Sequence, residues 1–339
     1  MQSMSVIIVA KNAEKTLPLC LNRLAVQDYD LSKVEVLVVD GGSTDKTREI
    51  ATANGAEVVN GGFPDNQEPR RYVGLLRSRN EIVLYLDSDN LMPNQHWLKD
   101  MTRPFDDASI MASFTQWYGI ENMMSLTNRY YSMIGGNDPV VYYLGKNDRA
   151  PYMKNSLPRG AELVADRGRY LKVRFDYKKL PVIGCNGFLV RRDFLNLLKL
   201  KSPEQFFHID IHVDLLRQYP DACYGIVKND ILHIAEHNLW AGVIKRLSYK
   251  QMHHDKFNKM RRYKVFDAGS VRDRGLLLWT IVCAATFVEP VFRSLLGFAR
   301  TKNGAWFLHP IALFLMVGTY ALSFILPGNG SLPERAHRV

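Results

Sequence analysis

Cysteine is scarce in this chain, and the common glycine-rich nucleotide-binding signatures are missing. The 339 residues contain four cysteines, spread widely and without a Cys-x-x-Cys pair: Cys20, Cys185, Cys223 and Cys283. This pattern disfavours a zinc site and a disulfide framework, and it favours a reducing cytoplasmic setting. Gly-x-Gly-x-x-Gly does not follow the first apolar run, and Gly-x-x-x-x-Gly-Lys-Ser/Thr is found nowhere. A Rossmann dehydrogenase and a P-loop NTPase are therefore disfavoured.

Internal repeats, low-complexity tracts and a recognisable signal peptide are also lacking. The run Val6–Ala10 is too short for the apolar core of a signal and has no basic leader. Positive charge, in contrast, is in excess: 44 Lys and Arg stand against 34 Asp and Glu, a formal net charge of +10. Such a charge predicts anionic partners, namely nucleic acid, phosphorylated small molecules or an acidic membrane surface.

The first hundred residues alternate between strand-like and helix-like segments. Four apolar runs are typical of strands buried in a sheet: Ser5–Ala10, Val34–Val39, Glu57–Val59 and Ile82–Leu86. Between them, helices are expected at Ala13–Gln27, Lys46–Asn54 and Pro69–Arg79. Ser43 or Thr44 is the expected N-cap of the second helix. The alternation predicts an α/β fold with a doubly wound, mostly parallel sheet.

Carboxylates follow two of these predicted strands directly. Asp87 and Asp89 end the stretch EIVLYLDSDN, and Asp40 ends the second run. In open α/β sheets, ligands bind outside the carboxyl ends of the strands. Asp-x-Asp is suited to a hard divalent cation shared with substrate phosphates, and Asp40 is suited to a ribose or a base. The alternative is that the acidic pair is a turn that caps the next helix.

Three stretches together resemble the nucleotide-sugar domain of family 2 glycosyltransferases, which have the GT-A fold. They are SVIIVAKN, EVLVVDGGSTDKT and EIVLYLDSDN, in the family's order and strand contexts. The resemblance is close over roughly the first 110 residues and looser to about residue 270. It implies transfer of a sugar from a nucleotide-sugar donor, with Mg²⁺ or Mn²⁺ as cofactor.

The resemblance also implies roles for individual residues. Asp89 would be the direct Mg²⁺ or Mn²⁺ ligand on the diphosphate, and Asp87 would face the donor ribose or the metal. Donor binding is further expected from Asp40 at the nucleobase or ribose and from Arg71, Lys11 and Asn12. The family's usual Pro after the first strand is replaced by Ala10.

The acceptor half of the family is matched less completely. Leu180–Arg192 resembles its G-x-x-x-F-x-x-R-R strand, and Phe206–Arg217 (FFHIDIHVDLLR) stands where Glu-Asp normally precedes a helix. The Asp of that pair is normally the general base, and the pair is absent here. Asp210 is the first choice for this base and His212 the second. Both residues could instead merely decorate the helix.

His233 stands where the family commonly has a histidine that completes the metal site or touches the diphosphate. It is therefore a candidate third metal ligand, although a histidine after an apolar strand is often structural. The region Met111–Asp176 interleaves aromatic and basic residues. Such interleaving can bind single-stranded nucleic acid, a membrane interface or a sugar–phosphate acceptor, or form an ordinary core with a solvated basic face. Beside this donor domain the membrane and the acceptor are favoured, and no nucleic-acid partner is expected.

The C-terminal part is basic and then apolar. From 240 to 274, ten Lys and Arg outnumber three Asp, which leaves a net charge of +7. With the apolar face of 239–247 this predicts an amphipathic contact with an anionic membrane surface. Two apolar stretches follow, Gly275–Leu296 and Ala305–Leu326. Basic residues on both flanks of the first predict that it lies in the interface or re-enters and that only the second spans. The alternative is a soluble helical hairpin.

The predicted organisation has five parts: a nucleotide-sugar half at 1–110, an acceptor half at 111–238, a basic amphipathic segment at 239–274, hydrophobic membrane-associated helices at 275–326 and a tail at 327–339. The leading hypothesis is an inverting glycosyltransferase that passes one sugar to a lipid-linked acceptor at the cytoplasmic face of a membrane. A soluble glycosyltransferase with a saccharide or protein acceptor, a nucleotidyltransferase, and a non-catalytic lipid- or nucleic-acid-binding protein remain alternatives.

Overall fold

The structure is a computed structural model that describes residues 1–339 except 155, 199, 235–237, 252–256 and 326–339. The predicted tail at 327–339 thus lies outside the described residues. The chain divides into two compact units. Unit 1 comprises Met1–Gly119 and Arg159–His233, and unit 2 comprises Ile120–Pro158 and Ile234–Val339. Each unit is therefore built from two separate stretches of the chain.

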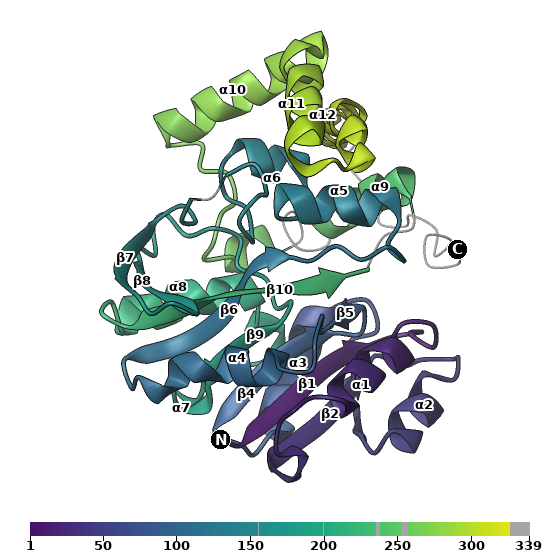
Figure 1. The fold of residues 1–339 in the computed structure, drawn as a ribbon, viewed down its shortest axis with the longest axis vertical. Coiled ribbons are helices and arrows are strands. Elements are labelled where there is room, and N and C mark those ends of the chain that lie inside the picture. Colours follow the sequence, from purple (N-terminus) through teal and green to yellow (C-terminus); the bar gives the residue numbers. More distant parts are fainter. Residues whose placement is uncertain (155, 199, 235–237, 252–256, 326–339) are drawn as a thin grey trace. The chain divides into compact units, whose positions relative to one another are not determined.

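Unit 1 is built on a ten-stranded, mixed sheet whose order is β3-β2-β1-β4-β9-β6-β10-β8-β7, with β5 paired to β10 (Figure 1). The first four strands in this order are parallel to one another. The strands are β1 (Met4–Ala10), β2 (Val34–Asp40), β3 (Glu57–Asn60), β4 (Ile82–Asp87), β5 (Asn90–Leu91), β6 (Ile110–Tyr118), β7 (Ala161–Asp166), β8 (Tyr170–Phe175), β9 (Phe188–Arg191) and β10 (Cys223–His233). The predicted α/β class with a mostly parallel sheet is confirmed.

The register of β1 brings the acidic strand ends together. All seven residues of β1 are buried, as expected of a continuous apolar run between two neighbouring strands. Ala10 pairs with Asp40 on β2, and Val9 pairs with Asp87 on β4. Asp40 and Asp87 therefore flank the carboxyl end of β1 from opposite sides.

Helices of unit 1 pack on this sheet. They are α1 (Leu17–Ala25), α2 (Thr47–Ala53), α3 (Gln67–Arg77), α4 (Trp97–Thr102), α7 (Arg192–Asn196) and α8 (His208–Gln218). Helix α3 lies close to the sheet, because a Cβ at Gly74 would come within 2.5 Å of Ile7 Cγ2. Its N-cap is Asn66, whose side chain accepts from Glu68 N–H. The close packing fixes the face of α3 that carries Arg70 and Arg71.

Two local predictions differ from the structure. Helix α1 begins at Leu17 rather than Ala13, because Pro18 is tolerated only at the first positions of a helix. The predicted N-cap of α2, Ser43 or Thr44, is wrong. The N-cap is Lys46, and Asp45 accepts from Thr47 N–H at 3.0 Å instead, while Ser43 is engaged by Asp40.

Unit 2 is helical over its described residues. Its helices are α5 (Leu126–Ile134), α6 (Pro139–Tyr143), α9 (Leu239–Tyr249), α10 (Val271–Thr286), α11 (Val288–Thr301), the short 3₁₀ helix η6 (Gly304–Leu308) and α12 (His309–Ile325). Helices α10 and α11 meet at a bend of 85°. In the part of the chain that the structure describes, one continuous helical segment, Gly304–Ser323, is long and apolar enough to cross a membrane by length and composition alone.

Candidate functional site

The two carboxylates after β4 lie in a turn that is fixed by its own backbone contacts. Asp87 is the last residue of β4, and its N–H donates to Asn90 Oδ1 at 3.0 Å. Asn90 is fully buried, whereas the side chains of Asp87 and Asp89 are 20% and 21% exposed. The element that follows is β5, and the N-cap of α4 is His96. The acidic pair therefore does not cap a helix, which removes that alternative.

His233 is brought to this turn by strand pairing. The two-residue strand β5 pairs antiparallel with the end of β10, which sets His233 opposite Asn90. His233 Nε2 lies 3.6 Å from Asp89 Oδ1. Its ring stacks on Tyr118, with centroids 5.8 Å apart, and the Tyr118 hydroxyl accepts from Asn186 Nδ2 at 2.7 Å. The imidazole is thus held beside the carboxylate by the pairing of β10 with β5 and by stacking on Tyr118, which Asn186 supports.

A buried chain of charged groups supports Asp87 from behind. Arg71 Nη2 donates to Asp87 Oδ1 at 2.6 Å, and Arg71 Nη1 donates to Glu68 Oε1 at 3.0 Å. Glu68 and Arg71 are almost fully buried. Buried charges are tolerated when they are paired, so the guanidinium is held between two carboxylates. Asp87 is thereby fixed by Arg71, while Asp89 has no such partner among the described ion pairs apart from His233.

Glu68 also contacts the first residue of α8. Its Oε2 accepts the His208 backbone N–H at 2.8 Å, and its Oε1 lies 2.6 Å from His208 Nδ1. The first turn of a helix has backbone N–H groups without partners inside the helix, and a carboxylate there is favourable. Glu68 therefore joins the start of α8 to Arg71 and, through it, to Asp87.

Helix α8 carries the two candidates for a general base. Asp210 is fully buried in its first turn, and His212 is almost fully buried. His212 packs edge-on against Phe188, and its Nδ1 lies 3.1 Å from the Tyr224 hydroxyl. Burial raises the pKa of Tyr224, so this hydroxyl stays protonated and can donate to His212. His212 is thus packed as part of the core of unit 1.

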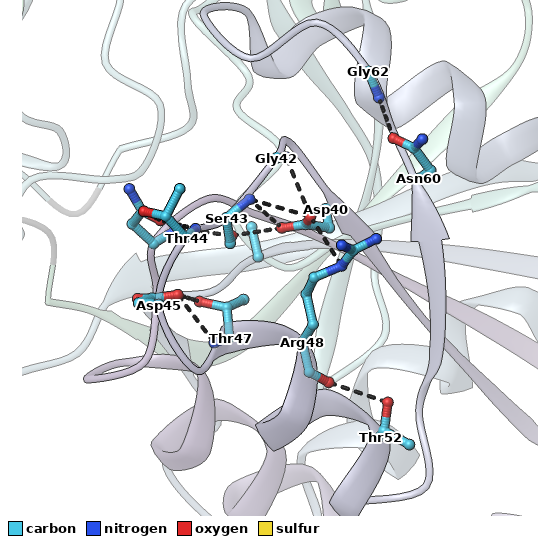
Figure 2. Close-up of polar contacts among 12 residues, drawn as sticks. Asp40, Gly42, Ser43, Thr44, Asp45, Thr47, Arg48, Thr52, Asn60 and Gly62 are labelled. Carbon is cyan, nitrogen blue, oxygen red and sulfur yellow. Dashed lines mark hydrogen bonds and ion pairs between the residues drawn. The ribbon is translucent and has the colours of Figure 1, made fainter.

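Asp40 organises the loop after β2 (Figure 2). Its carboxylate accepts from the N–H groups of Gly42 and Ser43 and from Ser43 Oγ, the last at 2.5 Å. Arg48 Nε lies 3.4 Å from Asp40 Oδ2. Asp40 is 1% exposed, so these contacts supply the partners that a buried carboxylate needs.

The loops after β1 and β2 are joined to each other. Asn12 N–H donates to Ser43 Oγ at 2.9 Å, and Thr44 N–H donates to Asn12 Oδ1 at 2.9 Å. Asn12 has a left-handed φ of 50°, a conformation that asparagine adopts more readily than most residues. Lys11 Nζ lies 3.8 Å from Asp65 Oδ1 in an exposed ion pair.

Arg70 lies beneath these loops and was not singled out by the sequence. Its Nη1 donates to the Ala10 carbonyl at 2.7 Å, at the carboxyl end of β1. Burial lowers its pKa to about 10, with Arg71 next door adding to the effect. A Cβ at Gly41 would come within 1.8 Å of Arg70 Nη1, so a side chain at this position would displace the Arg70 guanidinium. A buried cation therefore sits between the ends of β1 and β2, near Asp40.

A model of the family described as glycosyl transferase family 2 matches residues 5–198, more than half of the chain. The chain belongs to glycosyl transferase family 2. The family predicted from the three N-terminal stretches is thereby confirmed.

Curated relatives match about a third of the chain. One is 4,4'-diaponeurosporenoate glycosyltransferase of Staphylococcus haemolyticus, 34% identical over 110 residues that make up 31% of this chain and 28% of the relative. Another is glycosyltransferase AglE of Haloferax volcanii, 39% identical over 100 residues, 28% of this chain and 33% of the relative. The chain is thus aligned with a third or less of the length of each.

A solved structure with a similar fold aligns with most of the chain. The mannosyltransferase PcManGT from Pyrobaculum calidifontis, in complex with GDP-mannose and Mn²⁺, has a TM-score of 0.50 and 14% identity. The match covers 96% of this chain and 87% of that chain. The GT-A type architecture predicted for family 2 is confirmed by this comparison.

The structure places the predicted site residues in three locations: the turn after β4, helix α8, and the loops after β1 and β2. Arg71 contacts Asp87 and His233 contacts Asp89, and the two carboxylates stand one residue apart in the turn after β4. Asp210 and His212 belong to α8, whose first residue is tied to that group by Glu68. Asp40, Lys11 and Asn12 lie in the loops after β1 and β2. Their roles in binding and catalysis stay predictions.

Glu68 was missed by sequence reasoning. A signal was present, because Glu68 and Arg71 are three residues apart on a helix, a spacing at which side chains meet. The spacing does not show that the pair is buried, or that a residue 140 positions later completes it. Only the packing of α3 and α8 supplies that information.

Proposed function

We propose that this family 2 enzyme transfers one sugar from a nucleotide-sugar donor, with Mg²⁺ or Mn²⁺, to a lipid-linked acceptor by inverting displacement. The observation that carries the proposal is the meeting of Asp89, His233 and the Arg71-bound Asp87 at the carboxyl end of β4. This edge of a parallel sheet is the usual place for a nucleotide-type ligand.

The side chains after β4 fit a hard divalent cation that the donor helps to hold. Among the described residues no three His, Cys, Asp or Glu side chains already form a metal site. Mg²⁺ is typically held by one or two carboxylates together with substrate phosphates, which is what Asp87 and Asp89 offer. Asp89 would be the direct ligand, with His233 beside it. When bound, the cation would supply Lewis-acid stabilisation of the leaving diphosphate.

Donor recognition is assigned to the loops after β1 and β2. Asp40 and the loop that it orders would hold the ribose or the base, and the joined loop carrying Lys11 and Asn12 would face the nucleotide. Arg70 is a further candidate, because its buried guanidinium lies at the end of β1 and adds positive charge near the expected diphosphate. The PcManGT structure is a complex with GDP-mannose and Mn²⁺, which supports this type of donor.

Asp210 is proposed as the general base that accepts the proton of the acceptor hydroxyl. Asp210 lies in the first turn of α8, and the first residue of that helix, His208, is joined to Asp87 through Glu68 and Arg71, which supports the assignment. His212 is the alternative base, but its ring is engaged by Phe188 and Tyr224. The chain's own contribution is to hold the acceptor oxygen in line with the anomeric carbon.

A lipid-linked acceptor is favoured over a soluble saccharide or protein. One relative is named for 4,4'-diaponeurosporenoate, and unit 2 carries many exposed large apolar side chains on α10, α11 and α12. Contiguous apolar surface marks an interaction site rather than ordinary exterior. The enzyme would then work at the cytoplasmic face of the membrane, where nucleotide sugars are available.

A substitution of Glu68 by glutamine should weaken binding of the donor and the metal together. The buried Arg71 would lose the negative charge of Glu68 and would then pair more strongly with Asp87. This stronger pairing would compete with binding of the cation by Asp87. Changes of residues that support metal ligands typically cost 10–100-fold in metal affinity, so we expect the Kd of the nucleotide with Mn²⁺ to rise by about that factor. Isothermal calorimetry measures it.

The matched control is Glu57→Gln, which removes an exposed ion pair with Arg77 on the same unit. Its Kd should equal that of the unmodified enzyme. If Glu68→Gln lowers Tm but leaves the Kd unchanged, then Glu68 serves stability alone.

A panel of nucleotide sugars tests the proposed function directly. The full chain in detergent is heated with each donor, with Mn²⁺ or with a chelator. One nucleotide should raise Tm by about 5–10 °C at a concentration of about 100 times its Kd, and only with the metal. No stabilisation by any nucleotide sugar, together with stabilisation by single-stranded nucleic acid, would favour the nucleic-acid-binding alternative.

A further inference from the structure

Helix α11 has its apolar residues on the outside and its small or polar residues on the inside. Its buried residues are Pro290, Ser294 and Gly297. Its exposed face carries large apolar side chains, namely Val288, Val291, Phe292, Leu295, Leu296 and Phe298. A helix on the surface of a water-soluble protein has the opposite arrangement, with its apolar stripe toward the core.

Small residues in α11 allow its neighbour to approach closely. A Cβ at Gly297 would come within 2.3 Å of Trp306 Cδ2, and Ser294 Oγ donates to the Trp306 carbonyl at 2.8 Å. Such contacts, through small residues and hydrogen bonds, are typical of helices that associate inside a membrane.

Helix α10 repeats the inverted pattern. Its buried side chains include Asp273, Thr280 and Cys283, while Leu278, Trp279, Ile281 and Val282 are exposed. Asp273 is paired with Lys146 Nζ at 2.6 Å inside unit 2. Asp273 is therefore turned inward, whereas the large apolar side chains of α10 face outward.

The interior of unit 2 also contains a polar cluster next to these helices. His309 is fully buried, with Nδ1 2.8 Å from the Tyr130 hydroxyl and Nε2 3.1 Å from the Tyr143 hydroxyl. Glu289 accepts from Tyr143 and is paired with Arg293 on the next turn of α11. Ionisable residues within membrane segments face the bundle interior and pair with one another, as they do here.

The bend and the charges define how these helices meet a bilayer. Phe287, with a left-handed φ of 60°, separates α10 from α11, and the two helices diverge by 85° (Figure 1). Basic residues stand at the two outer ends: Arg272 and Arg274 lie in the first turn of α10, Arg300 lies in the last turn of α11, and Lys302 is its C-cap. The residues at the bend, Phe287 and Val288, are apolar. The outer ends of α10 and α11 are positively charged and the bend between them is apolar. This pattern is expected if both outer ends lie at the same layer of lipid headgroups and the bend lies in the hydrocarbon.

We propose that α10 and α11 form a re-entrant wedge that inserts into one leaflet of an anionic bilayer and returns to the same side. With 16 and 14 residues, the legs are about 24 and 21 Å long at 1.5 Å per residue. Legs inclined at about 45° reach about 15 Å, half of a hydrocarbon core of about 30 Å. The inference deepens the proposed function, on which it rests only for the membrane location of the acceptor.

Lipid is a better occupant than a second protein surface. The exposed apolar residues continue around η6 and α12 at Phe307, Ile311 and Phe314, so they are not confined to one flat patch. Four basic residues at the wedge ends complement anionic headgroups, each of which attracts a basic residue near the surface. A protein partner would have to enclose three differently directed helices.

Vesicle flotation and surface labelling test the wedge without any need for enzymatic activity. The full chain should float with vesicles of 7:3 phosphatidylcholine and phosphatidylserine, and less with phosphatidylcholine alone. Phe292→Ser combined with Leu295→Ser should reduce the bound fraction at least tenfold, because both side chains are exposed and replacing them leaves the packing of unit 2 intact. The control, Leu76→Ser on the exposed face of α3, should bind as the unmodified chain does.

Topology is read from cysteines placed at the two outer ends, Ser270→Cys and Lys302→Cys, in membrane vesicles from expressing cells. The four natural cysteines are buried, so an impermeant maleimide reports the new ones. Both should react from the same face, and Val288→Cys should react from neither.

Labelling of the two ends from opposite faces would overturn the proposal in favour of a span. A soluble oligomer that ignores vesicles would overturn it in favour of a protein interface. Loss of donor binding with flotation intact would count against the proposed function alone.

Discussion

Replacing Asp89 by asparagine should lower the rate of sugar transfer by about 10³-fold or more. The change keeps the size of the side chain but removes the negative charge that a hard cation needs. Lewis-acid stabilisation of a leaving group is worth several kcal/mol, and each 1.36 kcal/mol is tenfold in rate. Initial rates at saturating donor and acceptor, over a range of Mn²⁺ concentrations, measure the loss.

The control for this result is Asp221→Asn, which alters a carboxylate that is 93% exposed. Its rate should be that of the unmodified enzyme. Near-normal transfer by Asp89→Asn at every Mn²⁺ concentration would remove Asp89 from the metal site. Recovery at high Mn²⁺ alone would instead mean that Asp87 and His233 suffice to hold the ion.

Replacing Asp210 by asparagine should lower kcat by about 10²–10⁴-fold, the usual contribution of a general base. Binding of the nucleotide with Mn²⁺ should not change, because the proposed base would act on the acceptor and not on the donor. Single-turnover transfer measures the chemical step, and calorimetry measures donor binding on the same preparation.

His212→Asn is the matched comparison, since it alters a second buried residue two positions along α8. We expect it to lower Tm through the lost contacts with Phe188 and Tyr224 while turnover of the folded fraction is largely retained. Full turnover in Asp210→Asn together with its loss in His212→Asn would reverse the two assignments.

The strands and their acidic ends could be predicted because both correspond to short, continuous sequence patterns. A continuous apolar run is enough to predict a strand buried on both faces, as in β1, β2 and β4. Asp40 and Asp87 stand directly after the apolar runs of β2 and β4. The start of α1 was predicted at Ala13, too early in the chain. Pro18 is tolerated only in the first turn of a helix, so α1 begins at Leu17. The cap of α2 was misplaced because Asp40 competes for Ser43.

Contacts between distant segments could not be read from the residues alone. His233 is set beside Asp89 by the two-residue strand β5, which is too short to leave a pattern. Glu68 and His208 meet across 140 positions, and nothing in either segment points to the other. Unit 2 likewise combines 120–158 with the C-terminal helices, so the inverted faces of α10 and α11 become apparent only after packing.

The most direct test is a crystal structure of the enzyme with a nucleoside diphosphate and Mn²⁺, with data collected at the manganese absorption edge. An anomalous peak should lie about 2.1 Å from an Asp89 carboxylate oxygen, the distance usual for a hard divalent ion, and should contact the diphosphate. A manganese peak that contacts the diphosphate but neither Asp89 nor Asp87, or a nucleotide bound away from the ends of β1, β2 and β4, would contradict the account.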